Sequence, residues 1–496
     1  MDSSKIISLE DFIRKENRYP SEEEALSWAL QLCDIFEDST GGFRVLSPKN
    51  VYVENGNRWS TAHPPLTEDA SEALFRVGAL LHFLVTRDPF RISHYLDGPP
   101  AVRERNPQIS VRFESIIGKL LQNIRSLRYA NLPEFKEDLN QLQKEWKGDW
   151  TVHWPGFKGN GARTNHVNDA SFQPAGKILK EVWKADIGDV WGSAVVAGEY
   201  LFVGSGNGNF YSIDSQTGKI IWKLALGARI ESTACTDCNT AYIGNDLGAF
   251  HAINIRNGSV LWKKNLGEYI RSSAYYDDSF VYVGSINPAQ KTGFLWCLNR
   301  ENGSVIWKKG MGPVFSSPVV DRNEIILGSD DEKLYCMSVQ GAEKWKLSLS
   351  GKIRSTALSI RDFVYIGSFG NVFYKIRRST GEIVWENTEA GAMYSSPAYG
   401  RSFISVGGNS GAVSFYQQAT GKKSAEFATG GPVTATPLIV NQFVLVGSND
   451  GVFYILDSGG NAICTFDAKA PMNSTACYHN SMIYVGSDNG LRALSF

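Results

Sequence analysis

Short runs of β-branched and aromatic residues, separated by Gly-rich or polar turns, recur from about residue 176 to the C-terminus. Each unit has a strand-like run that ends in Gly-Ser, a turn, a second run, a turn with Thr-Gly or Asn-Gly, and a Trp. Two such units read "LFVGSGNGNFYSIDSQTGKIIW" and "VYIGSFGNVFYKIRRSTGEIVW". Such runs predict strands joined by hairpins, because Asn-Gly and Thr-Gly supply the positive-φ residue that a tight turn needs.

The period of the repeat follows from a fixed anchor. Each unit opens with a triplet of a small residue, Ser or Thr, and Ala or Pro, such as "STA" or "SSP". The residues that precede the eight triplets are Trp191, Glu231, Arg271, Phe315, Arg354, Tyr394, Thr434 and Asn473. Their successive separations, by subtraction, are 40, 40, 44, 39, 40, 40 and 39 residues. A period of this length with four short strands per unit predicts an all-β propeller of eight blades.

The last repeat ends one strand short, at "GLRALSF". We expect the segment "GKILKEVWKAD" to supply the missing strand, because its Trp183 occupies the place that a Trp holds in five other repeats. Those are Trp222, Trp262, Trp307, Trp345 and Trp385. The propeller is therefore predicted to close by strand exchange between its two ends, which leaves only protected edges.

The first part of the chain has a different, helical pattern with few Gly. "PSEEEALSWALQLCDIF" begins with a capping box, Ser21 and Glu24, followed by apolar residues on one broad face. "DASEALFRVGALLHFLVTRDPF" is apolar nearly all round, which predicts a central, buried helix. The chain is thus expected to hold a helical domain over residues 1–147, a linker and propeller lead-in over 148–175, and the propeller over 176–496.

Composition and charge narrow the function classes. The apolar content of 43% and charged content of 20% are ordinary for globular proteins, and the net charge is −1. We therefore expect neither nucleic acid nor a membrane as a partner. The N-terminal stretch is charged within its first five residues and has no apolar signal region, and the seven cysteines are scattered singly. These features favour reduced thiols and a cytoplasmic location.

One repeat carries a recognisable motif. "SIDSQTGKIIW" matches A-x-D-x-x-T-G-x-x-x-W through Asp214, Thr217, Gly218 and Trp222. This is the tryptophan-docking motif of pyrroloquinoline-quinone (PQQ) type propellers, which the chain resembles over roughly two thirds of its length. "WPGFKGNGARTN" looks like the lead-in that precedes the first blade in that family.

The resemblance implies that each docking Trp ties neighbouring blades together. Ala425 and Cys464 stand in its place in blades six and seven, where we expect looser packing.

The resembled family has two functional classes. Quinoprotein dehydrogenases hold PQQ and calcium on the axis, commonly with a vicinal Cys-Cys pair and a carboxylate base. This chain has no Cys-Cys pair and no acidic residues in the matching local motif. It is more similar to the second class, typified by a bacterial outer-membrane assembly scaffold, so we expect no cofactor and no catalytic residue.

The helical part resembles the C-terminal lobe of a protein kinase. Leu46, Pro48 and Asn50 in "FRVLSPKNVYV" match the "LKPEN" element, "DPF" at residues 88–90 matches the usual "PF", and Arg128 matches the buried Arg before the final helix. The order of these matches implies a kinase-like lobe.

Its departures remove kinase chemistry. Val45 stands where the catalytic Asp should accept the hydroxyl proton, and "RWSTAHPPLTED" offers no Asp-Phe-Gly to hold magnesium. We therefore expect a degenerate lobe kept for its surface.

Two short motifs suggest metal sites, and each is also explained by a turn between strands. Cys235 and Cys238 have the spacing of half a zinc site, but no second pair exists. Asp330, Asp331 and Glu332 are acidic enough for calcium, yet they fall at a predicted hairpin turn. No metal site is predicted.

Candidate binding residues lie next to the innermost strands. The residues just before the triplets, and those two positions earlier, are expected to face the axial channel or its rim. The set proposed to bind a partner or ligand is Trp191, Arg229, Glu231, Tyr269, Arg271, Phe315, Arg354 and Tyr394. Aromatic and Arg side chains are enriched at binding hot spots. Simple filling of the channel is the alternative.

Three functions follow in order of preference. The first is a non-catalytic scaffold or adaptor that binds protein partners through the axial face and the kinase-like lobe, with a kinase or its substrate as one candidate partner. The second is a sensor that holds a small metabolite on the axis. The third is a PQQ-dependent oxidoreductase.

Overall fold

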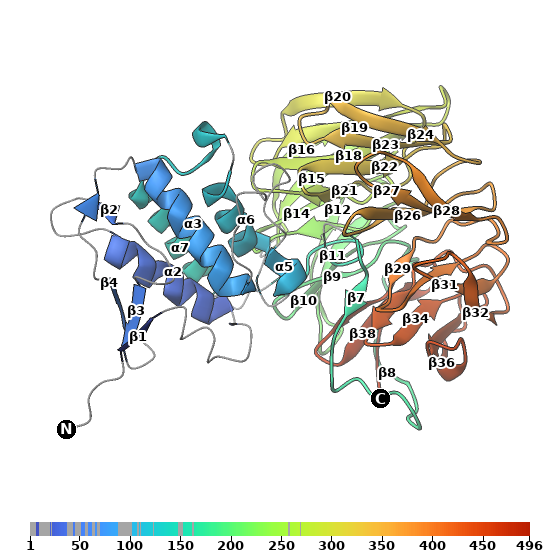
Figure 1. Cartoon of the computed structure of the whole chain (residues 1–496). Helices are drawn as coiled ribbons and strands as arrows, with labels where there is room; N and C mark the ends of the chain where they lie inside the picture. The colour runs from blue at the N-terminus through green and yellow to red at the C-terminus, as the bar shows by residue number, and fades with distance from the viewer. Residues whose placement is uncertain are drawn as a thin grey trace. The chain divides into compact units, whose positions relative to one another are not determined.

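The computed structural model describes residues 6–8, 20, 22–36, 43–44, 51–54, 58–61, 65–66, 70–87, 102–106, 109, 111–122, 124–146, 152–160, 163–255, 258–267 and 269–496. The chain divides into two compact units, residues 1–151 and 152–496. Figure 1 shows a helical unit and a ring of β-sheets. The residues predicted as linker and lead-in are thus divided, because those from Val152 onward lie in the second unit.

The first unit is mainly helical. Its helices are α2 (Glu22–Phe36), α3 (Ala70–Thr86), α5 (Val102–Arg105), α6 (Val111–Leu120), the 3-10 helix η1 (Arg125–Leu127) and α7 (Leu132–Trp146). Within the described residues, no helix is both long and apolar enough to cross a membrane. Helix α3 is buried on several sides, through Leu74, Val77, Leu81 and Val85, and shares one core with α2, α6 and α7. Its all-round apolar pattern predicted this central place.

The first unit also contains strands, which the helical prediction left out. An antiparallel sheet has the order β1-β3-β4, with β1 (Ile6–Ser8), β3 (Val51–Glu54) and β4 (Arg58–Thr61). A second pair joins β2 (Phe43–Arg44) to β5 (Pro65–Leu66). The segment "VYVENGNRWST" has β-branched and aromatic residues on both sides of Asn-Gly, which is a hairpin signal that outweighs the helical pattern around it.

A kinase-like lobe is not shown by this unit. Val45, Leu46, Pro48, Asn50 and residues 88–90 lie outside the described part of the chain. Arg128 is described and is half-buried: its Nε donates to the Gln122 carbonyl at 2.7 Å, and its guanidinium lies 4.4 Å from the Phe75 ring centre. These contacts join the α6–α7 connection to α3, a local role that does not require a kinase fold.

The second unit is an eight-bladed propeller (Figure 1). Each blade has four antiparallel strands, which follow sequence order in blades 1 to 7, whereas blade 8 takes its fourth strand from earlier in the chain. Blade 1 has β9 (Val195–Ala197), β10 (Tyr200–Gly204), β11 (Asn209–Asp214) and β12 (Ile220–Ala225). Blade 2 has β13 (Cys235–Thr236), β14 (Thr240–Gly244), β15 (Ala249–Asn254) and β16 (Val260–Asn265). Blade 3 has β17 (Tyr275–Tyr276), β18 (Phe280–Asn287), β19 (Thr292–Asn299) and β20 (Val305–Met311). Blade 4 has β21 (Val319–Asp321), β22 (Glu324–Gly328), β23 (Lys333–Ser338) and β24 (Glu343–Ser348).

The remaining blades follow the same plan. Blade 5 has β25 (Leu358–Ile360), β26 (Phe363–Gly367), β27 (Phe373–Arg377) and β28 (Ile383–Asn387). Blade 6 has β29 (Ala398–Tyr399), β30 (Phe403–Gly407), β31 (Ala412–Gln417) and β32 (Lys423–Ala428). Blade 7 has β33 (Leu438–Val440), β34 (Phe443–Gly447), β35 (Val452–Leu456) and β36 (Ala462–Asp467). Blade 8 has β37 (Cys477–His479), β38 (Met482–Ser487), β39 (Gly490–Ser495) and the earlier strand β8 (Lys180–Ala185).

The ring closes as the sequence predicted. Strand β8 pairs antiparallel with β39, with Trp183 opposite Ala493. The indole of Trp183 then donates to the Ser215 carbonyl of blade 1 at 3.0 Å, so the two ends of the propeller are linked by both a strand and a side chain.

The docking Trp side chains join successive blades. The indole of Trp262 donates to the Arg300 carbonyl of the next blade at 2.9 Å and lies on Gly303, where a Cβ would come within 2.6 Å of the ring. Gly303 also has a φ of 68°, so Gly serves both the turn and the contact. In blade 7, the Sγ of Cys464 lies 3.2 Å from the Pro174 carbonyl. Looser packing at Ala425 and Cys464 stays a prediction.

The repeated triplets form a belt of hydrogen bonds around the axis. The Ser193 amide donates to Thr233 Oγ1 of the next blade at 2.8 Å, and the Thr233 amide donates to Ser273 Oγ at 2.9 Å. The hydroxyls that accept in this way are Thr233, Ser273, Ser317, Thr356, Ser396, Thr436 and Thr475. Ser474 Oγ closes the circle by donating to the Gly192 carbonyl at 3.1 Å. The middle Ser or Thr of each triplet thus has a structural role.

The lead-in forms what we call the axial plug, residues 152–169. Strand β6 (Val152–Trp154) adds to β9 of blade 1, and β7 (His166–Val167) pairs in parallel with β33 of blade 7. Blades 1 and 7 both neighbour blade 8, and the same segment also reaches blades 3 and 4 through Arg163, which donates to the Ala274 and Pro318 carbonyls. The segment therefore crosses one end of the axis.

Buried polar side chains hold the plug in place. Lys158 Nζ donates to the Pro397 carbonyl at 2.7 Å, Arg163 Nη2 donates to the Ala274 carbonyl at 3.0 Å, and Asn165 Nδ2 donates to the Pro437 carbonyl at 2.5 Å. All three donors are buried, and burial together with the charge of Arg163 holds the pKa of Lys158 well below its usual value. Four triplets, those ending in Ala274, Pro318, Pro397 and Pro437, therefore offer a carbonyl that accepts from the plug.

Candidate functional site

The candidate residues form a ring that we call the axial mouth. Its members are the eight residues before the triplets and, two positions earlier, Asp189, Arg229, Tyr269 and Lys352. Each innermost strand runs from the mouth residue toward the end that pairs with the plug, as in β9 and β33. The mouth and the plug therefore lie at opposite ends of the axis.

A chain of ion pairs spans blades 1 to 3 of the mouth. Arg229 Nη2 lies 2.5 Å from Asp189, and its Nε donates to Glu231 at 2.8 Å. Arg271 Nη1 lies 3.0 Å from the second oxygen of Glu231, and its Nη2 donates to Asp246 at 2.9 Å. Asp246, which follows strand β14 in the turn to β15, was not among the residues predicted from the sequence. The recurrence of this turn in blades other than the extended blade 3 was the signal that could have found it.

A second ion pair joins blades 4 and 5. Arg354 donates to both oxygens of Asp330, through Nε at 3.0 Å and Nη2 at 2.8 Å, in a fork geometry that favours strong pairing. Lys352 Nζ is 3.9 Å from the same carboxylate. In the acidic turn that suggested calcium, Asp330 therefore forms an ion pair with the guanidinium of Arg354. No cluster of three or more His, Cys, Asp or Glu side chains suited to a metal occurs among the described residues.

Aromatic rings support the three Arg side chains. Arg229 lies 5.4 Å from the centre of the Trp191 ring, and Arg271 lies 5.4 Å from that of Tyr269. Arg354 lies 4.0 Å from the Phe315 ring. A further ring, Phe369, lies 5.5 Å from Arg354 and was not among the predicted residues. Each guanidinium is thus held by carboxylates and by a π-face, which fixes its orientation.

Titratable groups from opposite sides of the ring influence one another. Burial raises the pKa of Glu231 in spite of the nearby Arg271 and Arg229. Burial also raises the pKa of Tyr394, and the charge of Glu231 adds to this effect. Because Tyr394 belongs to blade 6 and Glu231 to blade 2, the phenol reaches toward the axis.

The mouth is asymmetric. In blades 7 and 8 it carries Thr434 and Asn473, whose side chains hydrogen-bond each other at 2.7 Å. The charged and aromatic residues gather in blades 1 to 5, which we call the charged arc. The structure thus brings the predicted residues to one mouth, with Tyr394 beside the arc.

The longer blade 3 stands beside this arc. Strands β18 and β19 have eight residues each, which accounts for the separation of 44 residues in the repeat. Tyr269 pairs with Ile286 at the extended end of β18, with amide–carbonyl bonds of 3.1 and 2.9 Å. The hairpin therefore rises next to Tyr269 and Arg271 on the mouth side.

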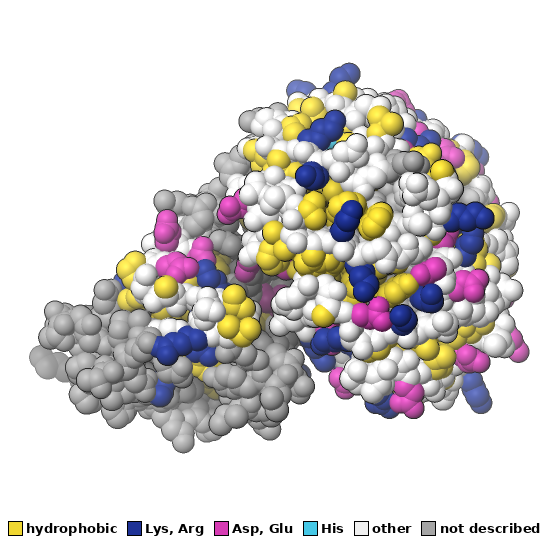
Figure 2. Space-filling model, turned by 90° about the horizontal axis from the view of Figure 1, so that it is seen from above, with side chains coloured by type: hydrophobic (Ala, Val, Ile, Leu, Met, Phe, Trp, Pro, Cys, Tyr) yellow, Lys and Arg dark blue, Asp and Glu magenta, His cyan; other side chains and the backbone are white. Residues whose placement is uncertain are grey.

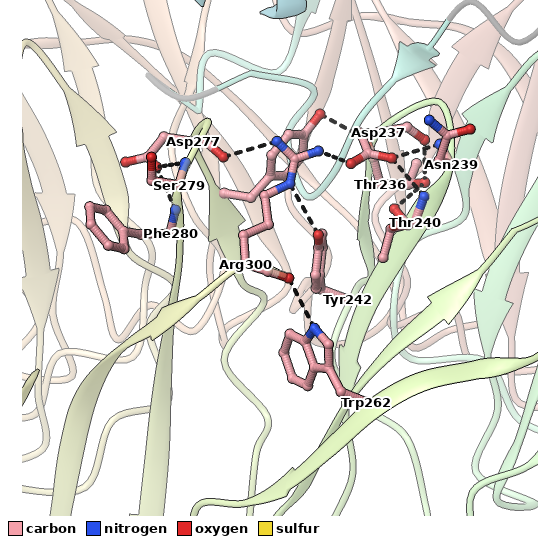
Figure 3. A network of polar contacts seen from close by, with 11 residues as sticks. Thr236, Asp237, Asn239, Thr240, Tyr242, Trp262, Asp277, Ser279, Phe280 and Arg300 are labelled. Carbon is pink, nitrogen blue, oxygen red and sulfur yellow. Dashed lines mark hydrogen bonds and ion pairs between the residues drawn. The ribbon is translucent and has the colours of Figure 1, made fainter. Parts of the chain in front are cut away.

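At the plug end, a polar cluster joins blades 2 and 3 (Figure 3). Arg300 pairs with Asp237, donates to the Tyr242 hydroxyl at 3.1 Å, and donates to the Asp277 carbonyl at 3.2 Å. Burial raises the pKa of the neighbouring Cys235 thiol to about 12. The cluster, including the predicted CxxC turn, has a structural role.

The outer strands present a mixed surface. Ile221, Leu261 and Ile306 are each about half exposed, and each lies at a β-bulge just before the docking Trp. Figure 2 shows hydrophobic and Lys or Arg side chains intermixed over the propeller face seen from above. Bulges and Lys are common protection for exposed edge strands, so we assign no site there.

Several solved structures share the fold of this chain. BamB from Moraxella catarrhalis is 20% identical, with a TM-score of 0.56 over 64% of this chain and 98% of that chain. Quinohemoprotein alcohol dehydrogenase from Comamonas testosteroni is 11% identical, with a TM-score of 0.60 over 69% and 80%. A europium-containing methanol dehydrogenase is 11% identical, with a TM-score of 0.59 over 72% and 100%. At these identities the likeness shows the fold alone, which an assembly factor and two dehydrogenases share.

No curated protein matches the sequence. The family described as outer membrane protein assembly factor BamB matches residues 180–387 and 368–495, which is more than half of the chain. This match extends from the first residue of β8 to the last of β39, so it includes every blade. The chain therefore belongs to the family described as outer membrane protein assembly factor BamB.

Proposed function

We propose that this chain is a non-catalytic interaction protein whose axial mouth binds a protein partner. The observation that carries the proposal is the set of oriented guanidiniums in the charged arc, each stacked on an aromatic ring and partly exposed. Arg, Trp and Tyr dominate interface hot spots because they combine contact area with directed hydrogen bonds. A rigid array of them loses little side-chain entropy when a partner binds.

The carboxylates of the mouth support a non-catalytic role. An enzyme base needs a carboxylate that is free to take a proton from its substrate. Here Glu231, Asp246 and Asp330 each accept from an Arg within the chain. We therefore propose no catalytic residue and no cofactor.

A small ligand on the axis is the second candidate. Its support is the convergence of Glu231 and Tyr394, whose pKa values are both raised by burial, from opposite blades. A metabolite that binds there would raise the melting temperature of the wild type and leave that of a Tyr394→Ala variant unchanged.

We also propose a cytoplasmic location and a partner that includes a kinase or its substrate. Cys235, Cys297, Cys336, Cys464 and Cys477 are buried thiols in the propeller, a state suited to a reducing compartment. The kinase partner rests on the resemblance of the helical unit alone. Cell fractionation, with a kinase-activity assay on captured material, tests both.

Affinity capture from native lysate tests the main proposal. The wild type is compared with a triple mouth variant, Trp191→Ala, Arg271→Ala, Tyr394→Ala. We expect a stoichiometric partner that the wild type retains and the variant loses, because three contact side chains are removed from one surface.

A matched variant on the outer strands provides the control. This variant also removes three exposed side chains, through Ile221→Ala, Leu261→Ala and Lys308→Ala. They lie in β12, β16 and β20, the outermost strands of their blades, whereas the mouth lies next to the innermost strands. This control should retain the partner. If the mouth variant, folded as judged by its melting curve, keeps the partner and the outer-strand variant loses it, the proposal is wrong.

A further inference from the structure

The charges of the mouth are arranged in layers. Three of the four carboxylates lie deep, with exposed fractions of 10% for Glu231, 12% for Asp246 and 6% for Asp330, whereas Asp189 is 26% exposed. The cations lie nearer the surface, with exposed fractions of 37% for Arg229, 31% for Arg271, 25% for Arg354 and 55% for Lys352. Arg229, Arg271 and Lys352 are thus more exposed than any carboxylate of the mouth, although the charges balance overall.

Hydrogen-bond donors remain available in this outer layer. Arg354 uses Nε and Nη2 for Asp330, and Arg229 uses Nε and Nη2 for Glu231 and Asp189. Within the described part of the chain, the Nη1 group of each makes no contact of hydrogen-bond length. Lys352 is too far from Asp330 for a hydrogen bond, at 3.9 Å. Two guanidinium Nη1 groups and one ammonium thus have N–H groups to offer.

These donors are already oriented. The deep carboxylates fix one edge of each guanidinium, and the rings of Trp191 and Phe315 fix its plane. A fork held in this way is suited to a planar anionic acceptor, because little freedom is lost when the acceptor binds. The aromatic rings beside the donors add apolar contact.

We propose that the charged arc binds an acidic segment of a protein partner, with partner carboxylates accepting from Arg229 and Arg354. This inference rests on the proposed function and names the chemistry of the partner. The two donors come from blades 2 and 5, on different sides of the ring. A peptide segment with several carboxylates can present one carboxylate to each guanidinium.

Fluorescence anisotropy with a labelled octaglutamate peptide tests this inference on the full chain, with labelled octalysine as the comparison probe. We expect octaglutamate to bind and octalysine not to bind. A double variant, Arg229→Gln and Arg354→Gln, should lower the affinity for octaglutamate at least about 30-fold, since a hydrogen bond to a charged group contributes about tenfold or more.

The control variant changes the same charge at the other end of the axis. Arg322 and Arg361 lie in turns at the plug end of blades 4 and 5. The affinity of the Arg322→Gln, Arg361→Gln double variant for octaglutamate should stay within about twofold of that of the wild type. Lys352→Gln, at a largely exposed side chain, gives a third variant with little risk to folding and should weaken binding less than the double variant.

The outcomes separate the two proposals. If octaglutamate fails to bind, or if both double variants weaken it equally, the acidic-segment inference is overturned. The proposed function still stands in that case if the triple mouth variant loses its protein partner. If octaglutamate binds through Arg229 and Arg354 but no captured protein depends on the mouth, the proposed function falls, and the assignment of the acidic segment to a protein partner falls with it.

Discussion

At the scale of single residues, His251 shows how burial couples the fold to pH. It lies in β15 with 2% of its surface exposed. Burial, together with the positive charge of Lys263, lowers its pKa to about 4 from an ordinary value of 6.5. Its Nδ1 is buried without a hydrogen-bond partner among the described residues. The imidazole is therefore neutral in the folded state at every pH at which the propeller is expected to work.

This shift predicts a loss of stability in acid. Below pH 6.5 the unfolded chain binds a proton at His251 that the folded chain does not bind until about pH 4, so the free energy of unfolding falls through that window. Between pH 7.5 and 5.0 the effect of this one group should be about 2 kcal/mol.

Urea unfolding at both pH values, followed by Trp fluorescence, measures this term. Between pH 7.5 and 5.0, the free energy of unfolding of a His251→Leu variant should fall by about 2 kcal/mol less than that of the wild type. Phe250→Leu, next to His251 in β15, is the control, since it changes the buried core without removing a titratable group, and its loss of stability over the interval should match that of the wild type. Equal losses in the wild type and His251→Leu would contradict the prediction.

At the scale of elements, buried Arg residues join neighbouring blades at the plug end. Arg300 links blades 3 and 2 through Asp237, and Arg378 links blades 5 and 4 through Asp321 at 2.9 Å and Glu324 at 2.8 Å. The carbonyl of each also accepts from a docking Trp. The docking motif was predictable from sequence spacing. The Arg contacts were not, because they depend on which turns of adjacent blades meet.

Removing one of these links should destabilise the propeller strongly. Arg300→Ala leaves Asp237, with 15% of its side chain exposed, without its cation, and breaking a buried pair in this way costs about 3–5 kcal/mol. Thermal unfolding of the variant and the wild type measures the change.

An exposed pair between blades 4 and 5 provides the matched control. Arg322 lies 3.4 Å from Asp362, whose side chain is 75% exposed. Arg322→Ala should cost no more than about 1 kcal/mol, because water screens the pair. If both variants lose the same stability, the buried cluster does not have the role assigned to it.

At the scale of the whole molecule, the axial plug and the exchanged strand make the ring a closed unit. The side chain of Arg163 is 2% exposed and donates to carbonyls of blades 3 and 4, Ala274 at 3.0 Å and Pro318 at 3.3 Å. Arg163→Met leaves these carbonyls buried without that donor, at a cost of about 1–3 kcal/mol for each.

We therefore expect Arg163→Met to lower the free energy of unfolding by at least about 3 kcal/mol. Urea unfolding with intrinsic fluorescence measures this value. Arg401→Met, at an exposed residue with a weak 3.4 Å contact to Asn168, should change the free energy of unfolding by less than about 0.5 kcal/mol. A propeller that tolerates Arg163→Met as well as Arg401→Met would show that the plug is dispensable.

The sequence by itself determined the parts of this protein that repeat. The period, the docking Trp with its Gly, the strand borrowed for blade 8 and the residues of the mouth could all be predicted, because each follows from local pattern and spacing. The hairpin of β3 and β4 carried a local signal too, which the surrounding helical pattern obscured.

Only the tertiary structure decided how these parts meet. It placed Asp246, Asp330 and Phe369 in the charged arc, and it placed Lys158 and Arg163 across the opposite end of the axis. These contacts join residues from different blades, so they depend on the register of each sheet and on closure of the ring. Spacing along the chain predicts which residues reach the axis, whereas the distances between blades determine which of them pair.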